Sequence, residues 1–308
     1  MRMQIKRATL KQFRAVRAVA QTGSISAAAE ALALTAPAVH SQIKGLEETI
    51  GLPLLSRSAD SAGSAPSEAG QIVLDYATRI EALIARMGDD LSALGRGAAG
   101  RVVLSVVSTG KYFAPRLVKA LNEALPGIEI VLLVGNREKV IADLDRGLCD
   151  IAIMGRPPRA PLVDAVPLGP HPHSFVAPPD HPLAGRATVT AADLAAQQFI
   201  SREEGSGTRS LMARYLETVI EGAYATTVMD SNETIKQAVM AGLGIAFLSL
   251  HTVTDELHSG RLVVLNVPGL PISRHWFLVR AVDQPDRPAV TRLRDAILAM
   301  EGSYLPVG

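Results

Sequence analysis

Hydroxyl, amide and arginine side chains recur in this sequence where apolar, strand-like runs give way to helical stretches. Such places are residues 108–109 (Ser-Thr), 136–137 (Asn-Arg), 205–209 (Gly-Ser-Gly-Thr-Arg) and 231–233 (Ser-Asn-Glu). Glycines let backbone N–H groups converge, hydroxyls donate hydrogen bonds, and arginine clamps an oxyanion. These residue types therefore predict a site for a small anion, either a phosphate or a carboxylate. For the Gly-Ser segment the alternative is an ordinary turn.

The candidate residues of this anion site come from several strand ends and helix starts. Arg209 is predicted to clamp the anion. For Arg137 and Arg156 the alternative is surface pairing with Glu138 or Asp150. The full candidate set is Ser108, Thr109, Lys111, Asn136, Arg137, Arg156, Gly205, Ser206, Gly207, Thr208, Arg209, Asn232 and Glu233.

A second group of candidate residues belongs to a helix predicted to begin after Thr35. An α-helix fits the major groove of DNA, and its first residues meet the base edges. Lys44 is predicted to reach a guanine or a phosphate, although a solvated lysine is the alternative. Arg57 is predicted to contact a phosphate. The predicted DNA-binding residues are Thr35, Ala36, Pro37, His40, Ser41, Lys44 and Arg57.

The residue patterns of common enzymes are missing from the sequence. There is no Ser-His-Asp order with a nucleophile elbow and no phosphate-binding Gly-Lys-Ser/Thr loop. His171 and His173 flank Pro172, but no carboxylate or cysteine cluster accompanies them. We therefore predict no catalytic residue, metal or cofactor. A two-lobed α/β enzyme stays as a remote alternative.

The elements that position the DNA-binding residues form a small N-terminal domain, residues 1–67. Helices are predicted at 9–21, at 25–33 with Ser24 as its N-cap, and from Thr35 to Ile50, where Gly51 ends the helix. Two helices joined by a tight turn at this spacing are typical of a helix-turn-helix. Residues 52–67 are predicted to form a loop or a small hairpin.

Residues 68–95 are predicted to form one long helix. Its apolar residues recur at intervals of three, four and seven, which favours pairing with a second copy of the helix. The alternative is an amphipathic helix packed on its own domain. The predicted dimer contacts are Val73, Tyr76, Ile80, Leu83, Met87 and Leu94.

Residues 100–308 alternate between strand and helix patterns, which predicts an α/β domain built on parallel strands. Strands are predicted at 101–107, 128–134, 151–154 and 274–282, and helices at 111–124, 137–146 and 289–300. We expect two α/β lobes on a double hinge, with a cleft between them. Lobe I comprises 100–169 and 273–308, and lobe II comprises 170–272. The lobes are like those of periplasmic solute-binding proteins, but such a protein needs an export signal and leaves residues 1–67 unexplained.

Charge and composition fit a DNA-binding protein. Residues 1–67 hold eight Lys/Arg and four Asp/Glu, a net charge of +4, whereas residues 68–308 hold 23 and 26, a net charge of −3. A basic small domain favours a polyanion partner. The single cysteine, Cys149, fits a reducing cytosol and is predicted to be a core residue, with a reactive thiol as the alternative. No apolar run is long enough to span a bilayer, so we expect a cytoplasmic protein.

The N-terminal motifs resemble the signature of LysR-type transcriptional regulators. The matching segments are Phe13-x2-Val16-x2-Val19, Thr22-Gly23-Ser24-x-Ser26-x-Ala28-Ala29-x2-Leu32, Ala38-Val39-x2-Gln42-Ile43-x2-Leu46-Glu47, Gly51-x-Pro53-Leu54-Leu55-x-Arg57 and Glu68-Ala69-Gly70. The resemblance implies a winged helix-turn-helix and a two-lobed effector-binding domain. It also implies a homodimer or a dimer of dimers (a homotetramer) that binds inverted-repeat, double-stranded operator DNA, with RNA polymerase as a further partner.

The effector-binding half is similar to regulators of Calvin-cycle (RuBisCO) operons. This similarity rests on the segments 107–117, 134–138, 154–158, 204–209 and 231–244. It implies regulation of carbon-dioxide-fixation genes by ribulose bisphosphate, phosphoglycolate, phosphoenolpyruvate or NADPH, whereas a plain carboxylate for another operon is the alternative. One departure concerns the wing, because residues 58–67 contain no basic residue. His40 also stands where the family often has serine, so DNA affinity or site preference is expected to differ.

Overall fold

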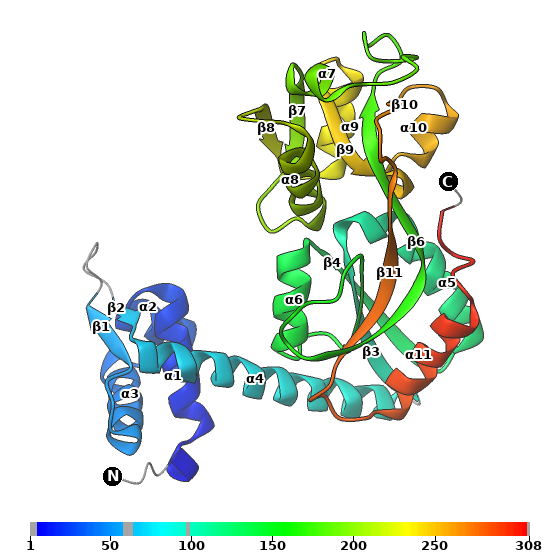
Figure 1. Ribbon diagram of the computed structural model, residues 1–308. Helices are drawn as coiled ribbons and strands as arrows, with labels where there is room; N and C mark the ends of the chain where they lie inside the picture. Colours follow the sequence, from blue (N-terminus) through cyan, green and yellow to red (C-terminus); the bar gives the residue numbers. More distant parts are fainter. Residues whose placement is uncertain (1–4, 58–63, 97–98, 307–308) are drawn as a thin grey trace. The chain divides into compact units, whose positions relative to one another are not determined.

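The computed structural model describes residues 5–57, 64–96 and 99–306. The chain divides into two compact units, Met1–Gly88 and Asp89–Gly308 (Figure 1). The long helix α4 (Glu68–Gly95) begins in the first unit and ends in the second. No helix among the described residues is long and apolar enough to cross a membrane.

The first unit is built on three short helices that follow a one-turn segment at Ile5–Arg7. They are α1 (Leu10–Thr22), α2 (Ile25–Ala31) and α3 (Ala36–Ile50). The side chains of Ser24 and Thr35 accept hydrogen bonds from the backbone N–H groups of the first turns of α2 and α3, as the sequence predicts. Helix α2 ends two residues before its predicted end, because the chain turns at Ala33 with a φ of 54°.

A two-stranded hairpin and the start of α4 complete the first unit. Strands β1 (Leu55–Arg57) and β2 (Ser64–Pro66) are antiparallel, so the predicted small hairpin is confirmed. The core draws on all three helices, the hairpin and α4. Helix α4 passes so close to the hairpin that a Cβ atom on Gly70 would lie 2.0 Å from the carbonyl oxygen of Leu54. Only glycine fits there.

Helix α4 carries an exposed apolar stripe. Val73 was predicted to belong to this stripe but is 8% exposed and packs in the core of the first unit, because α4 begins against the three short helices. Ile80 is half-buried. The other four predicted contacts, Tyr76, Leu83, Met87 and Leu94, are between 53% and 71% exposed. Leu91, which was not predicted, is also exposed and belongs to the same stripe.

The second unit contains one nine-stranded sheet that passes through two lobes. In lobe I three parallel strands have α6 on one side and α5 and α11 on the other (Figure 1). The predicted helix at 111–124 begins only at Ala114, because Ser108–Tyr112 form a 3-10 turn. The lobe I elements are β3 (Gly100–Val107), β4 (Ile128–Gly135), β5 (Ile151–Met154), α5 (Ala114–Ala124), α6 (Arg137–Asp145) and α11 (Pro288–Ala299). Cys149 is fully buried in this core, as predicted.

Lobe II has a separate core on each face of its strands. Phe175, Phe199 and Phe247 point to one core, and their strand neighbours point to the other, which follows from the alternation of side chains along a strand. The lobe II elements are β7 (Gln198–Arg202), β8 (Ala225–Met229), β9 (Ile245–Ser249), β10 (Val263–Val264), α7 (Ala191–Ala195), α8 (Gly207–Val219), α9 (Asn232–Met240), α10 (Thr254–His258) and a 3-10 turn at Leu250–Thr252.

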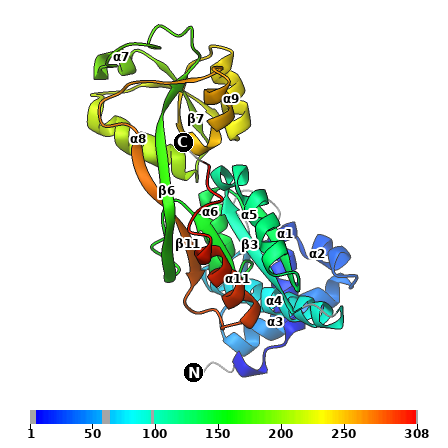
Figure 2. The ribbon, with the colours of Figure 1, turned by 90° about the vertical axis from the view of Figure 1, so that its right-hand side faces the viewer.

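The two lobes are joined by strands. The chain leaves lobe I along β6 (Val163–Ala177) and returns along β11 (Ile272–Ala281), and the two run antiparallel side by side (Figure 2). The register shifts once, between Trp276 and Phe277. The prolines at 167, 170 and 172 hid the first half of β6 from sequence analysis. Proline is tolerated there because this half of β6 has β11 as its paired strand and leaves its other edge free.

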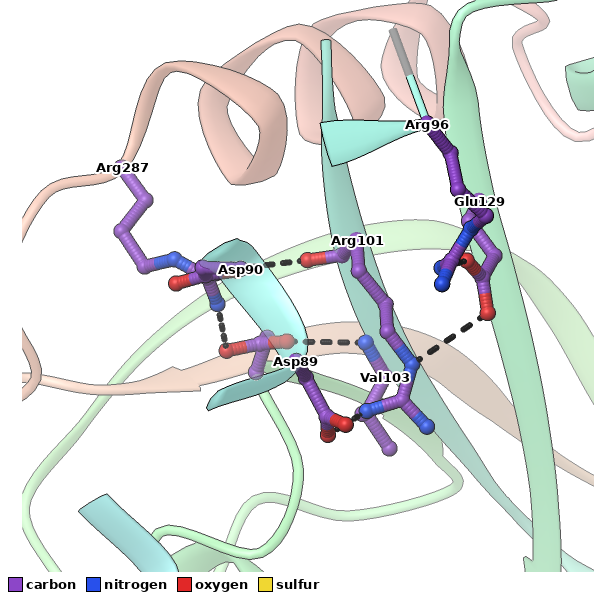
Figure 3. Close-up of polar contacts among 8 residues, drawn as sticks. Asp89, Asp90, Arg96, Arg101, Val103, Glu129 and Arg287 are labelled. Carbon is purple, nitrogen blue, oxygen red and sulfur yellow. Dashed lines mark hydrogen bonds and ion pairs between the residues drawn. The ribbon is translucent and has the colours of Figure 1, made fainter. Parts of the chain in front are cut away.

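An ion-pair network fixes the end of α4 to lobe I within the second unit. Arg287 contacts Asp90 of α4, lies 2.9 Å from the buried carboxylate of Asp150, and donates to the carbonyl oxygen of Arg101 at 2.8 Å. Arg101 in turn pairs with Asp89 (Figure 3). Since Asp89 points to β3 and Asp90 points to the residue that precedes α11, α4 enters this lobe in a defined orientation.

Candidate effector cavity and DNA-binding surface

The structure presents the predicted DNA-binding residues on the outside of α3. Thr35, Pro37, His40, Ser41 and Lys44 are exposed and Ala36 is half-buried, whereas Val39, Ile43 and Leu46 face the core. Pro37, His40, Ser41 and Lys44 follow one another at intervals of three, one and three positions, so they share one side of the helix over its first turns. Arg57 lies in β1, and its side chain is outside the described residues, as are residues 58–63 of the wing.

A cavity of about 360 Å³ lies between the two lobes of the second unit. Lobe I contributes the end of β3, the start of α6 and the residues after β5. Lobe II contributes the first turns of α8, and the crossing strands contribute the rest. The lining residues are Val107, Ser108, Thr109, Arg137, Gly155, Arg156, His171, His173, Ser206, Gly207, Thr208, Ser210, Leu211, Arg214 and Arg274.

The cavity is strongly cationic. Four arginines line it, and no aspartate or glutamate does among the residues described. Arg137 donates to the carbonyl oxygens of Arg156 and Pro157, which orient its guanidinium without neutralising it. Burial lowers the pKa of Arg137 and of Arg274, and the neighbouring arginines of the cavity lower both further. Mutually repelling, desolvated cations are stabilised by a bound anion.

Seven of the thirteen predicted anion-site residues line the cavity. Ser206 caps α8 by accepting a hydrogen bond from the backbone N–H of Arg209, so the first turn of the helix points its free N–H groups toward the cavity. A Cβ atom on Gly207 would lie at an ordinary contact distance of 3.4 Å from the Arg137 side chain, so the start of α8 and the start of α6 are close neighbours here. The seven are Ser108, Thr109, Arg137, Arg156, Ser206, Gly207 and Thr208.

Three predicted residues lie beside the cavity without lining it. Arg209 points from a different side of α8 than Ser206, Ser210 and Arg214, and donates to the carbonyl oxygen of Arg202 at 3.5 Å. The structure therefore places the predicted clamp beside the cavity and not in its lining. Asn136 caps α6 by accepting from the Lys139 N–H at 2.9 Å. Gly205 uses its positive φ of 79° to turn the chain, and its carbonyl oxygen accepts from Glu138.

The other three predicted residues link the lobes. Lys111 of lobe I pairs with Glu233 of lobe II at 3.4 Å, and Tyr112 donates to the same carboxylate at 2.5 Å. Asn232 is buried and accepts from Arg202, which also crosses to the Ser108 hydroxyl at 3.0 Å. The structure therefore places Lys111 and Glu233 in a contact between the lobes and Asn232 beside Arg202, and none of the three is in the cavity lining.

Sequence reasoning missed eight lining residues: Val107, Gly155, His171, His173, Ser210, Leu211, Arg214 and Arg274. A signal for Arg214 was present, because Ser206, Ser210 and Arg214 are spaced four apart and share a helix face. Arg274 lies directly opposite His171 in the antiparallel pair. That juxtaposition depends on the register of β6 with β11, which no local pattern encodes.

The described residues contain no group of three or more His, Cys, Asp and Glu side chains that could hold a metal ion. The chemistry of the cavity is therefore that of arginines, hydroxyls, backbone N–H groups and two buried histidines. Such a set binds an anion by charge and hydrogen bonds.

Comparison with known sequences supports the resemblance seen in the motifs. Residues 10–71 match the bacterial regulatory helix-turn-helix protein family of the lysR type, and residues 95–301 match the LysR substrate binding domain. The HTH-type transcriptional regulator CbbR of Cereibacter sphaeroides is 56% identical over 299 residues, which cover 97% of this chain and 96% of the relative. The RuBisCO operon transcriptional regulator of Allochromatium vinosum is 39% identical over 291 residues, 94% of this chain and 96% of the relative.

Two solved structures have the same fold. The regulatory domain of CcmR from Synechocystis PCC6803, in complex with 2-PG, is 32% identical, with a TM-score of 0.61 and coverage of 65% of this chain and 97% of that one. Full-length CbnR complexed with its target DNA is 21% identical, with a TM-score of 0.69 and coverage of 94% and 99%. The predicted fold class and the resemblance to RuBisCO operon regulators are confirmed, and the relatives are regulators, not enzymes. The protein belongs to the LysR family of helix-turn-helix transcriptional regulators.

Proposed function

We propose that this regulator controls carbon-dioxide-fixation (RuBisCO) genes in the cytoplasm, and that a small phosphorylated metabolite bound between its lobes is the signal. The relatives named for CbbR and for the RuBisCO operon support the target genes. The single observation that supports a phosphorylated effector is the lining of the cavity. Four arginines and several hydroxyls converge there, and no carboxylate is among the described lining residues. A dianionic phosphate uses more of these donors than a carboxylate does.

The dimensions of the cavity favour a small ligand. A volume of about 360 Å³ is at the low end for ligand pockets. Phosphoglycolate, phosphoenolpyruvate and ribulose bisphosphate are therefore better candidates than NADPH. The CcmR regulatory domain, which has the same fold, was solved with 2-PG, and this supports phosphoglycolate as the first ligand to test. A plain carboxylate is the second candidate, because arginines and hydroxyls also bind carboxylates.

Calorimetry with matched ligands separates these candidates. We expect phosphoglycolate to bind the wild-type protein and glycolate, which lacks only the phosphate, to bind far more weakly. Arg274→Ala should weaken phosphoglycolate binding by about tenfold to hundredfold, since a charged hydrogen bond contributes ~1.5–3 kcal/mol. Arg209→Ala is the matched control and should bind like wild type. Equal heats from glycolate and phosphoglycolate would remove the phosphate from the proposal.

For operator binding we propose that α3 enters the major groove. The carrying observation is that its predicted contact residues are exposed while its apolar face is buried. Lys44→Ala is expected to weaken binding by ~1–3 kcal/mol if Lys44 reads a guanine, and Arg57→Ala to lower the salt slope by ~1 if it contacts a phosphate. Fluorescence anisotropy with operator DNA measures both. Lys119→Ala, an exposed lysine of α5, is the control.

We also propose that the exposed stripe of α4 pairs two copies into a dimer, and that two dimers assemble on inverted-repeat DNA. Six large apolar side chains lie more than half exposed along this helix, and five of them form the stripe: Tyr76, Leu83, Met87, Leu91 and Leu94. Contiguous apolar surface of this kind marks an interface. Dimerisation places two recognition helices on two half-sites. Contact with RNA polymerase would follow from promoter binding.

A further inference from the structure

His171 is the most deeply buried polar group of the cavity whose hydrogen bonds are incomplete. The side chain belongs to the crossing strand β6 and is 3% exposed. Its Nε2 lies 3.0 Å from the hydroxyl of Ser249, whereas its Nδ1 has no partner. A Cβ atom on Gly155, also a lining residue, would lie 2.8 Å from Nδ1. Nδ1 therefore lies against Gly155 at the wall of the cavity, where any larger residue would cover it.

The charges around His171 are all basic. Arg274 lies opposite His171 on β11, and His173 lies two residues further along β6. His251, from the turn after β9, stacks on His171 with 5.8 Å between the ring centroids. The other arginines of the cavity are Arg137, Arg156 and Arg214. Burial, followed by these neighbouring basic groups, holds the pKa of His171 well below 6.5. Without an anion beside it, the ring is neutral at pH 7.

We propose that His171 takes up one proton from solution when a phosphate-type dianion binds in the cavity, so that effector affinity rises as pH falls. The imidazolium then donates from Nδ1 to an oxygen of the anion and from Nε2 to the Ser249 hydroxyl. The proton comes from the buffer, and no other bond changes. The inference rests on the proposed function, because it requires an anion in this cavity.

The physical reason is that the same desolvation that disfavours a lone imidazolium strengthens its attraction to an anion. A dianion also offsets the repulsion from the arginines that lowers the histidine pKa. Arginine keeps its charge at all accessible pH values, so the four arginines give affinity without pH dependence. Histidine is the side chain whose charge changes near neutrality. Of the two histidines that line the cavity, His173 has its Nδ1 bonded to the carbonyl oxygen of His171, whereas Nδ1 of His171 has no partner, so we assign the pH response to His171.

Calorimetry on the full-length wild-type protein tests this directly. Inorganic sulfate is the first probe, because it keeps two charges throughout this pH range, and phosphoglycolate is the second. Titrations in two buffers of different ionisation enthalpy count the protons taken up. We expect uptake to approach one proton per sulfate as pH falls, and the Kd to fall by about tenfold per pH unit at the steepest point.

Two variants assign the proton. His171→Gln keeps a hydrogen-bonding side chain but cannot ionise, so the pH dependence of the sulfate Kd should be lost. His251→Gln is the matched control, because His251 is a buried histidine of the same cluster that does not line the cavity. It should keep the wild-type slope. The only tryptophan, Trp276, stacks on His171 at 3.7 Å, and a protonated imidazole there quenches its emission. Sulfate should quench Trp276 more strongly at low pH in wild type than in His171→Gln.

The outcomes separate this inference from the proposed function. Binding of sulfate or phosphoglycolate with no proton uptake and a flat sulfate Kd overturns the role of His171 and leaves the anion cavity standing. A wild-type slope in His171→Gln also overturns it, because another group then carries the proton. No heat from either probe at any pH overturns both the cavity and the histidine.

Discussion

Arg287 offers a quantitative test of how lobe I is held together. Its guanidinium lies 2.9 Å from Asp150, whose side chain is 3% exposed, and also contacts Asp90 and the Arg101 carbonyl oxygen (Figure 3). Removing one partner of a buried ion pair costs ~3–5 kcal/mol. Asp150 keeps the backbone N–H of Val103 as a donor, at 2.8 Å, and Arg287 is 16% exposed. We therefore expect Arg287→Ala to destabilise the second unit by about 2–3 kcal/mol.

A thermal melt of the full-length protein followed by Trp276 fluorescence is the assay, because the only tryptophan is buried in the core of lobe I. For a unit of this size the loss corresponds to a fall in Tm of about 5–10 °C. The control is Arg294→Ala within α11, the helix that follows Arg287, because its partner Asp164 is 59% exposed whereas Asp150 is buried. Such a surface pair contributes ~0–1 kcal/mol. If both variants melt within about 1 °C of wild type, the network does not stabilise this lobe.

Three further predictions follow from other parts of the structure. Leu83→Asp places a charge in the exposed stripe of α4 and should halve the sedimenting mass and abolish operator binding. Ala85→Asp, on another side of the helix, is the control and should change neither. A Leu83→Asp protein of wild-type mass contradicts the dimer. Burial first lowers the pKa values of His171, His173 (to about 3) and His251 (to about 4), so the unfolded chain binds protons below pH 6.5 while the folded one does not. The free energy of unfolding should thus be highest near pH 7 and fall towards pH 5 by ~1.4 kcal/mol per pH unit for each histidine. Urea unfolding at several pH values measures this free energy, and a value that does not change with pH refutes the prediction. Gly70→Ala should destabilise the first unit strongly, because the methyl group would overlap the Leu54 carbonyl oxygen. Heating followed by circular dichroism measures this, and an unfolding transition unchanged from wild type would contradict the packing.

The sequence predicted those features that local patterns encode. Capping by Ser24 and Thr35, the stop at Gly51 and the alternating strands and helices of lobe I all depend on neighbouring residues. The cavity was half predicted, because strand ends and the start of α8 are local features. Arg274 and His171 were missed because they meet through the pairing of strands about 100 residues apart in the chain.

Arg209 and Val73 were both expected at places where the structure does not put them. Arg209 has the right residue type beside the right segment, yet one position around a helix turns a side chain by ~100°, and this takes it away from the cavity. Val73 fits the spacing of the stripe on α4, but it lies where the helix is covered by the first unit. Periodicity identifies an apolar face without identifying what covers it.

The pairing of β6 with β11 makes lobe II an insertion within lobe I. Where the chain passes between the lobes, Gly169 and Trp276 are neighbours across the sheet, although the sequence between them contains the whole of lobe II. The core of lobe I draws its buried residues only from outside this insertion among the residues described. Replacing the inserted segment with a short hairpin turn should therefore leave a chain that can fold as a minimal lobe I. Lobe II, whose two ends lie side by side, could likewise be exchanged as a cassette between regulators of this architecture.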